Sequence, residues 1–237
     1  MSSSEPTRSP YAPYVPHERH DDRGAQSVDH GPHRDDHGPQ HDDRRHRPVD
    51  PAVSLAKIAV MTALMAVLGA MPGIPVPLVP APITLQTLAV MLAGIVLGPW
   101  RGAASMLLFN ALVALGLPLL AGGRGGLGAF AGPSVGFILG WILATLVVGL
   151  VFRAMTGRLR PGISAGRVFT AAFVASVVGA IVVLYACGIP GMALVAGLPL
   201  DKAALGSAAF LPGDLVKAVV ASLLAAGLWK AYPRAFR

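Results

Sequence analysis

An aspartate and a lysine lie three residues apart at the start of the last apolar segment of this chain. They are Asp214 and Lys217, in the sequence LPGDLVKAVV of residues 211–220. Residues three apart share one face of a helix, and ionisable side chains inside a membrane usually mark a functional site. Asp214 would accept a hydrogen bond from an N–H, and Lys217 would donate to a carbonyl or carboxylate. The pair therefore suits a neutral polar ligand with a urea or amide edge.

The same pair has a structural interpretation. Pro212 is favourable in the first turn of a helix, and a carboxylate there meets the positive end of the helix dipole. Asp214 would then be a helix-capping acid with Lys217 as its partner. Against this, Lys217 lies deeper in the apolar segment, whereas a lysine that only needed water would extend to the surface. We keep capping as the alternative and treat the pair as a candidate site.

Few other polar or aromatic residues accompany the pair at its expected level in the membrane. The polar run of residues 84–87 opens the second apolar segment, and aromatic residues occur in the fourth and fifth segments. Aromatic side chains there either pack the core or contact a ligand. The candidate ligand contacts are Thr84, Gln86, Tyr185, Trp141 and Phe137. Asn110, midway along the third segment, is expected to hydrogen-bond between helices.

The composition indicates a membrane protein. The chain has 237 residues, of which 54% are hydrophobic and 13% charged, and its mean hydropathy is +0.60; soluble domains have about 25% charged residues. Residues 51–237 contain twelve Lys and Arg but only two acids. These cations separate apolar runs and form no surface stripe, so we expect membrane lipid, and not nucleic acid, around the protein.

Residues 1–50 differ from the rest and are predicted to be a disordered cytoplasmic tail. They hold ten acids, seven arginines and all seven histidines, with little that could form a core. The motif HDDR recurs at residues 20–23 and 41–44, a composition that binds metal weakly; we assign it no metal site. The first apolar run begins too late for a cleaved signal peptide, and the single cysteine, Cys187, permits no disulfide within the chain.

Residues 51–237 are predicted to be all-α, as six transmembrane helices in a compact bundle. The spans are placed at residues 53–71, 83–98, 102–120, 134–155, 166–187 and 212–231, because a helix of about 20 residues crosses the hydrocarbon core. Nine cations fall at one set of span ends and two, Arg124 and Lys202, at the other. Since cationic loops stay inside the cell, both termini are predicted to be cytoplasmic.

Two outer connections are unusual. Residues 71–82 contain five prolines and no charge, so they cannot be helical and are predicted to pack on the bundle as a lid. Residues 122–133 are rich in glycine and contain Arg124. This loop either contacts a ligand, since its backbone N–H groups could hold an anion, or is an external loop. It lacks the residues of a nucleotide-binding P-loop.

Small residues form a stripe on the first span, including Ala59 and Ala63. Small residues four apart let another helix approach closely, and that helix belongs either to this bundle or to a partner protein. The sequence has no Walker motif, no metal-binding His/Glu helix and no Gly-x-Ser-x-Gly, so we predict neither an ATPase nor another enzyme. One intramembrane acid and no evident inverted repeat also argue against a proton-coupled pump.

The apolar part contains PITLQTLAVMLAG at 82–94, LGPWRG at 97–102, GLP at 116–118, GPSVGF at 132–137, YACGIP at 185–190 and LPGDLVK at 211–217. In these motifs the chain resembles the BioY family of biotin transporters, over about residues 55–232. The motifs are specific in combination. Arg124 and Asn110 match no family rule.

The resemblance implies the substrate-binding S component of an energy-coupling-factor (ECF) importer in the cell membrane, with biotin as the transported substrate and no cofactor. It implies that Asp214 and Lys217 form the family's Asp-x-x-Lys biotin site. The implied partners are a transmembrane coupling protein and two cytosolic ATPases, with Ala59 and Ala63 as the expected docking face. Two rivals are a small membrane enzyme that uses Asp214 and Lys217, and a self-sufficient carrier of another solute.

Overall fold

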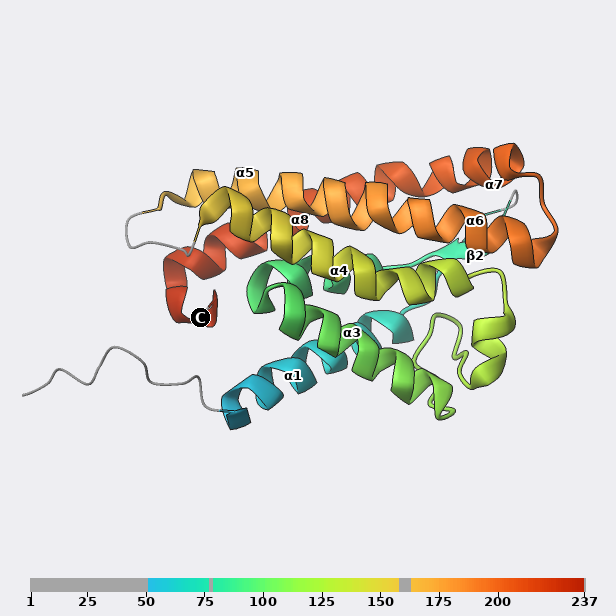
Figure 1. Cartoon of the computed structure of the whole chain (residues 1–237), viewed down its shortest axis with the longest axis horizontal. Coiled ribbons are helices and arrows are strands. Elements are labelled where there is room, and N and C mark those ends of the chain that lie inside the picture. The colour runs from blue at the N-terminus through green and yellow to red at the C-terminus, as the bar shows by residue number, and fades with distance from the viewer. Residues whose placement is uncertain (1–50, 77–78, 158–162, 237) are drawn as a thin grey trace, which may run out of the picture. The chain divides into compact units, whose positions relative to one another are not determined.

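A computed structural model describes residues 51–76, 79–157 and 163–236 as a helical bundle (Figure 1). The predicted disordered tail at 1–50 lies outside the described residues. The elements of the first half are α1 (Pro51–Ala70), β1 (Ile74–Val76), β2 (Val79–Ile83), α2 (Gln86–Leu92), η2 (Ala93–Leu97), α3 (Pro99–Ala114) and η3 (Leu127–Ala131). Those of the second half are α4 (Val135–Thr156), α5 (Ala165–Ser176), η4 (Val177–Val183), α6 (Leu184–Ala196), α7 (Leu200–Ser207), η5 (Ala208–Phe210), α8 (Leu211–Ala231) and η6 (Pro233–Phe236).

Among the described residues, four helices are long and apolar enough to cross a membrane: Pro51–Ala70, Val135–Thr156, Ala165–Ala196 and Leu200–Ala231. These confirm a helical, multi-pass membrane protein. The second and third predicted spans are shorter, at Gln86–Leu97 and Pro99–Ala114. A helix of 12 residues, such as Gln86–Leu97, is about 18 Å long, well below the roughly 30 Å of the hydrocarbon core.

Two helices run much farther than the sequence predicted. Ala165–Ala196 and Leu200–Ala231 each span 32 residues, where the predicted spans were 166–187 and 212–231. The predicted boundaries were wrong because prolines were taken as helix ends. Pro190 lies inside α6, and Pro212 lies in the first turn of α8, which follows directly from η5. Neither proline breaks the chain of helical residues.

The connection between η2 and α3 is a single residue. Gly98 has a φ of 81°, a conformation that side chains with a Cβ rarely adopt. Pro99 then begins α3, which suits a residue whose φ is fixed and whose missing N–H needs no partner there. The predicted start at residue 102 was therefore three residues late, and the predicted end at 120 was six residues late.

The proline-rich segment contains the β-strands of the described chain. β1 and β2 pair in antiparallel fashion, with Ile74 opposite Ile83 and Val76 opposite Val79. The segment is non-helical, as predicted, although strands were not expected. Ile74 is 63% exposed while Ala81 is buried, so β2 rests on the bundle and β1 is the outer strand, with Val76 still in contact with the core. The glycine-rich loop ends in the short helix η3 and leads into α4.

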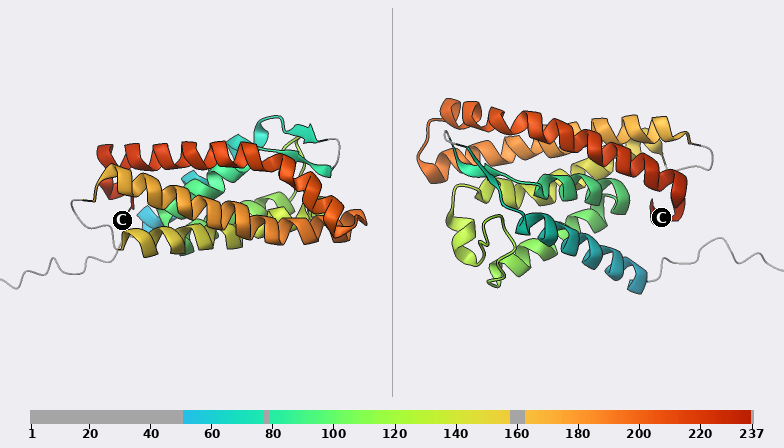
Figure 2. Two further views of the ribbon diagram at one scale, coloured as in Figure 1. Left: turned by 90° about the horizontal axis from the view of Figure 1, so that it is seen from above. Right: turned by 180° about the vertical axis from the view of Figure 1, so that it is seen from behind.

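α4 is the central helix of the core. It packs against α3, α5, α6 and the two π-helical segments η2 and η4, and its side chains Ile138, Val148 and Phe152 are almost fully buried. α5 and α8 pack side by side, as both views of Figure 2 show. Each of the two helices buries three alanines, namely Ala171, Ala172 and Ala175 of α5 and Ala218, Ala221 and Ala225 of α8.

The central alanines of the predicted stripe on α1 do not pack inside the bundle. Ala59 and Ala63 are both exposed, whereas Met61, Thr62 and Met65 of the same helix are buried. Thr62 donates to the carbonyl of Ser105 on α3. Ala59 and Ala63 are thus open to lipid or to a partner, and the alternative of internal packing is wrong for these two alanines, although Ala66 of the same stripe packs against the core.

Candidate functional site

Asp214 lies in the first turn of α8 and is only 3% exposed. Its Oδ1 accepts hydrogen bonds from Thr87 Oγ1 at 3.0 Å and from Lys217 Nζ at 2.8 Å. Its Oδ2 accepts from the Tyr185 hydroxyl at 2.7 Å. The bonds it makes within the described chain come from side chains, so the alternative of a helix cap is not supported. A carboxylate has about four lone-pair positions, which leaves Oδ2 one for a ligand N–H.

Lys217 is also buried, at 7% exposure. Besides its ion pair with Asp214, its Nζ donates to the backbone carbonyl of Thr84 at 2.6 Å and to Thr87 Oγ1 at 2.9 Å. An ammonium group has three donors, and all three are used. Lys217 therefore neutralises Asp214 and ties α8 to the start of α2. The predicted donation from Lys217 to a ligand is not what this geometry offers.

A cavity opens beside the pair, and four aromatic side chains form part of its walls. Phe137 and Trp141 of α4 line it, together with Tyr185 of α6. Phe137 packs edge-on against Tyr185, with ring centroids 6.2 Å apart, and against Phe210 at 6.0 Å. The structure thus brings the three predicted aromatic residues around one cavity. Flat apolar walls with a few polar groups are typical of sites for small organic ligands.

Thr84 and Gln86 also line the cavity, in roles that the sequence did not specify. Thr84 contributes its backbone carbonyl to Lys217. Gln86 is 1% exposed, and its Nε2 lies 3.5 Å from the carbonyl of Leu119, which is a long hydrogen bond. Thr87 contacts the ion pair directly, because its side chain hydrogen-bonds both Asp214 and Lys217.

Phe210 and Ser134 were missed as site residues. Phe210 lines the cavity four residues before Asp214, a spacing that puts both on one helix face and was the available signal. Ser134 also lines the cavity, and its buried Oγ has no hydrogen-bond partner within the described chain. Nothing in the sequence around Ser134 distinguishes it from a helix-capping serine.

Arg124 and Asn110, which match no family rule, both make side-chain hydrogen bonds to backbone carbonyls. Arg124 lines the cavity and is exposed; its Nε donates to the carbonyl of Ala121 at 3.2 Å. The two terminal nitrogens of that guanidinium face no hydrogen-bond partner in the described residues. Asn110 instead donates from Nδ2 to the carbonyl of Ile138 at 3.0 Å, which joins α3 to α4. The prediction of an interhelical hydrogen bond for Asn110 is confirmed.

Comparisons with known proteins agree with this arrangement. The family described as the BioY family matches residues 42–234. The biotin transporter BioY of Rhizobium etli is 46% identical over 179 residues, which cover 76% of this chain and 94% of that protein. The probable biotin transporter BioY of Bacillus subtilis is 45% identical over 173 residues, covering 73% and 88%.

A solved structure has the same fold. It is the crystal structure of the S-component for biotin from an ECF-type ABC transporter, which matches with a TM-score of 0.70 at 29% sequence identity. The match covers 78% of this chain and 96% of the solved one. With the family match over most of its length and several relatives above 30% identity, this chain belongs to the BioY family.

Proposed function

We propose that this protein captures biotin at the outer face of the cell membrane, as the substrate-specific subunit of an ECF-type vitamin importer. The observation that carries the proposal is the buried carboxylate of Asp214, with an unused acceptor position on Oδ2 beside an aromatic cavity. Family membership and the structural likeness to a biotin S-component support the same ligand.

Biotin has the groups that this cavity requires. Its ureido ring carries N–H donors, and one of them would bond Asp214 Oδ2. The ureido carbonyl needs a donor, and the unpartnered hydroxyl of Ser134 is available in the cavity wall. The fused ring would lie against Trp141 and Phe137, because flat apolar surfaces favour contact with aromatic rings.

The carboxylate of biotin needs a cation, and Arg124 supplies it. The cavity is lined by two cations, Arg124 and Lys217, among the described residues. Lys217 has no donor left, whereas the terminal nitrogens of Arg124 are unused and lie at the exposed side. A guanidinium binds a carboxylate through two parallel hydrogen bonds. The glycine-rich loop is thus assigned to ligand contact.

The protein is proposed to have six membrane-crossing segments with both termini in the cytoplasm. The four long helices, with the shorter α2–η2 and α3, give an even number of crossings. Lys57 near the start of α1 donates to the carbonyl of Ala235 near the C-terminus at 3.1 Å, so the two ends of the described chain meet. The cation excess at that end supports a cytoplasmic position for both ends.

Energy for uptake would come from partner proteins, since the sequence carries no Walker motif. The proposed partners are a transmembrane coupling protein and two cytosolic ATPases. Ala59 and Ala63 are the proposed docking face, because they are small, four residues apart and exposed. The rival of a membrane enzyme is not favoured, since the relatives are named as transporters.

Equilibrium binding of radiolabelled biotin to the purified full-length protein tests the proposal. Unlabelled biotin should displace the label at stoichiometric concentration. Desthiobiotin, which keeps the ureido group, should compete more weakly, and lipoate, which lacks the ureido group, should fail to compete. Absence of saturable binding, or equal competition by lipoate, would show that the cavity takes another solute.

A further inference from the structure

A second cavity lies at the other end of the bundle, far from the proposed biotin site. It is lined by Arg101 and Arg153, with apolar walls that include Ile95, Phe152 and Phe236. Arg153 lies sixteen residues along α4 from Phe137, which lines the first cavity. At 1.5 Å per residue, the two positions are about 24 Å apart along the helix, so the cavities are separate sites.

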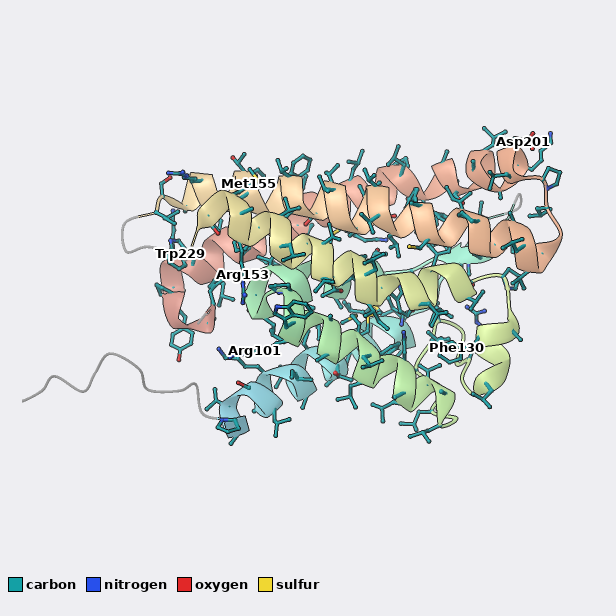
Figure 3. All side chains as sticks on the ribbon, viewed as in Figure 1. Arg101, Phe130, Arg153, Met155, Asp201 and Trp229 are labelled. Carbon is teal, nitrogen blue, oxygen red and sulfur yellow. The ribbon has the colours of Figure 1, made fainter. Side chains whose placement is uncertain are left out.

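The second cavity gathers positive charge, and no carboxylate is among the described residues that line it. The charge of Arg101 lies close enough to repel those of Lys57 and Arg153. Within the described residues, neither Arg101 nor Arg153 forms a hydrogen bond or ion pair through its side chain. From Pro51 onward the sequence has two acids, Asp201 and Asp214. Figure 3 shows Arg101 and Arg153 near each other and Asp201 at the opposite end of the bundle.

One of the two arginines is held in place by the backbone. The guanidinium of Arg153 lies against the α-carbon of Gly98, so closely that a β-carbon at that position would overlap it. Gly98 is the one-residue connection before α3, and Arg101 lies in the first turn of that helix. The same short turn therefore positions both cations at the wall of the cavity. Two positive charges that are held close together favour the binding of an anion between them.

The chemistry of the walls identifies the kind of anion. Guanidinium groups bind phosphate oxygens through paired, geometrically fixed hydrogen bonds. The apolar walls of Ile95, Phe152 and Phe236 suit hydrocarbon next to that phosphate. Trp100, which also lines the cavity, is 72% exposed, as is typical of a side chain at the membrane interface. Basic cavities between membrane helices on the cytoplasmic side bind the head groups of anionic lipids.

We propose that Arg101 and Arg153 form a binding site for the phosphate of one anionic membrane lipid, with its acyl region against the apolar wall. This inference goes beyond biotin capture and does not depend on it. It assigns the cavity a resident lipid that neutralises the two arginines. The site would hold one ordered anionic lipid at the end of the protein opposite to the biotin site.

Native mass spectrometry tests the proposal on the full-length protein, released from nanodiscs made of equal parts phosphatidylglycerol and phosphatidylcholine. The wild-type protein is expected to retain one phosphatidylglycerol. In the double variant Arg101→Gln/Arg153→Gln, the fraction of protein with this lipid is expected to fall at least fivefold. The conservative variant Arg101→Lys/Arg153→Lys, which keeps both charges, should retain most of it.

The matched control is Arg167→Gln. Arg167 is an exposed cation on α5 that does not line the cavity, so this variant loses a charge from the protein but none from the site. It should keep the wild-type level of bound lipid. Thermal unfolding, measured for every variant in the same nanodiscs, shows that each one is folded. Equal lipid loss in Arg167→Gln and in the double variant would mean that net charge alone holds the lipid, and the proposal would be overturned.

Two further results would also overturn it. If millimolar inorganic phosphate displaces the lipid and chloride at the same ionic strength does not, the bound anion is a soluble phosphate. If the glutamine double variant keeps its phosphatidylglycerol but no longer assembles with the coupling protein and ATPases, the arginines meet carboxylates of a partner. Retention of lipid by the wild type, loss in the glutamine variant and no effect of phosphate support the lipid site.

Discussion

Asp214 and Lys217 stabilise each other at a depth where neither charge would be stable alone. Both are almost fully buried, and between them they use Thr84, Thr87 and Tyr185 as hydrogen-bond partners. A buried ion pair contributes little net stability, but removal of one partner leaves an uncompensated charge that costs about 3–5 kcal/mol. The pair is therefore fixed by its surroundings before any ligand arrives, which lowers the ordering cost of binding.

Replacement of Asp214 by asparagine should weaken biotin binding at least tenfold. A lost charge-assisted hydrogen bond costs about 1.5–3 kcal/mol, and about 1.4 kcal/mol corresponds to a tenfold change. Equilibrium binding to the purified variant measures the effect. Asp201→Asn is the control, since Asp201 is the other acid of the membrane part and is exposed. If a folded Asp214→Asn protein binds biotin with unchanged affinity, Asp214 does not contact the ligand.

Replacement of Lys217 by methionine should destabilise the protein by roughly 3 kcal/mol or more, because Asp214 would remain buried without its cation. The double variant Lys217→Met/Asp214→Asn removes both charges and should recover part of that loss. Thermal unfolding in detergent, measured for wild type, both single variants and the double variant, gives the coupling between the two residues. Additive losses would show that the two side chains do not stabilise each other.

The central pair of the site could be predicted from sequence, but its working partners could not. Asp214 and Lys217 stand out because acids are so rare in the apolar part of the chain. Thr87 and Phe210 do not, since threonine and phenylalanine are common in membrane helices and only their contacts distinguish them. The saturation of Lys217 depends on a backbone carbonyl of Thr84, which no residue type reveals.

At the level of elements, the proline-rich hairpin forms part of the proposed biotin site. Ala81, Pro82 and Ile83 of β2 line the cavity, while β1 lies on the outside. A two-stranded hairpin is marginally stable without other contacts, so its position depends on what it packs against. A ligand in the cavity would add contacts to β2 and hold the hairpin in place.

A cysteine introduced at Val76 should therefore react more slowly with a membrane-impermeant thiol reagent when biotin is bound. Val76 is half-buried at the tip side of β1. The test uses a Cys187→Ala background, because Cys187 is the single native cysteine. Lys202→Cys, at an exposed position on α7, is the control and should react equally with and without biotin. Equal labelling at Val76 in both conditions would contradict a lid.

Helix boundaries were harder to predict than the helical, multi-pass architecture, for a physical reason. Pro190 and Pro212 normally signal helix ends in water, where a broken hydrogen bond is replaced by solvent. In a membrane, unpaired backbone groups are costly. Neighbouring helices and local π or 3₁₀ turns therefore supply hydrogen bonds to the backbone groups that a proline leaves unpaired. The chain accordingly continues as helix through Pro190 and from η5 into Pro212.

At the scale of the whole molecule, the exposed alanine stripe of α1 and the proposed biotin site lie on different elements. No residue of α1 lines the cavity. Its walls come from α4, α6, α8, β2, the start of α2 and neighbouring loops. Docking and ligand binding should therefore be separable by mutation.

Replacement of both Ala59 and Ala63 by leucine should reduce transport with little change in biotin binding. The larger side chains keep a partner helix from close approach but remain compatible with lipid. Copurification with the coupling protein and ATPases, together with uptake assays, measures the docking. The control Val60→Leu/Val67→Leu adds volume at exposed positions of α1 outside the stripe. Normal copurification and uptake by the alanine variant would contradict docking at this face.

The hydrogen bonds of Lys217 also have an electrical consequence. Its charge cancels that of Asp214 at 2.8 Å, and in the proposed complex Arg124 cancels the biotin carboxylate. A unit charge that crosses the membrane field gains or loses about 2.3 kcal/mol per 100 mV, but a loaded site built from these four groups carries no net charge. Movement of the loaded site should therefore be insensitive to membrane voltage, whereas the empty site keeps the net charge of Arg124 and its return should depend on voltage.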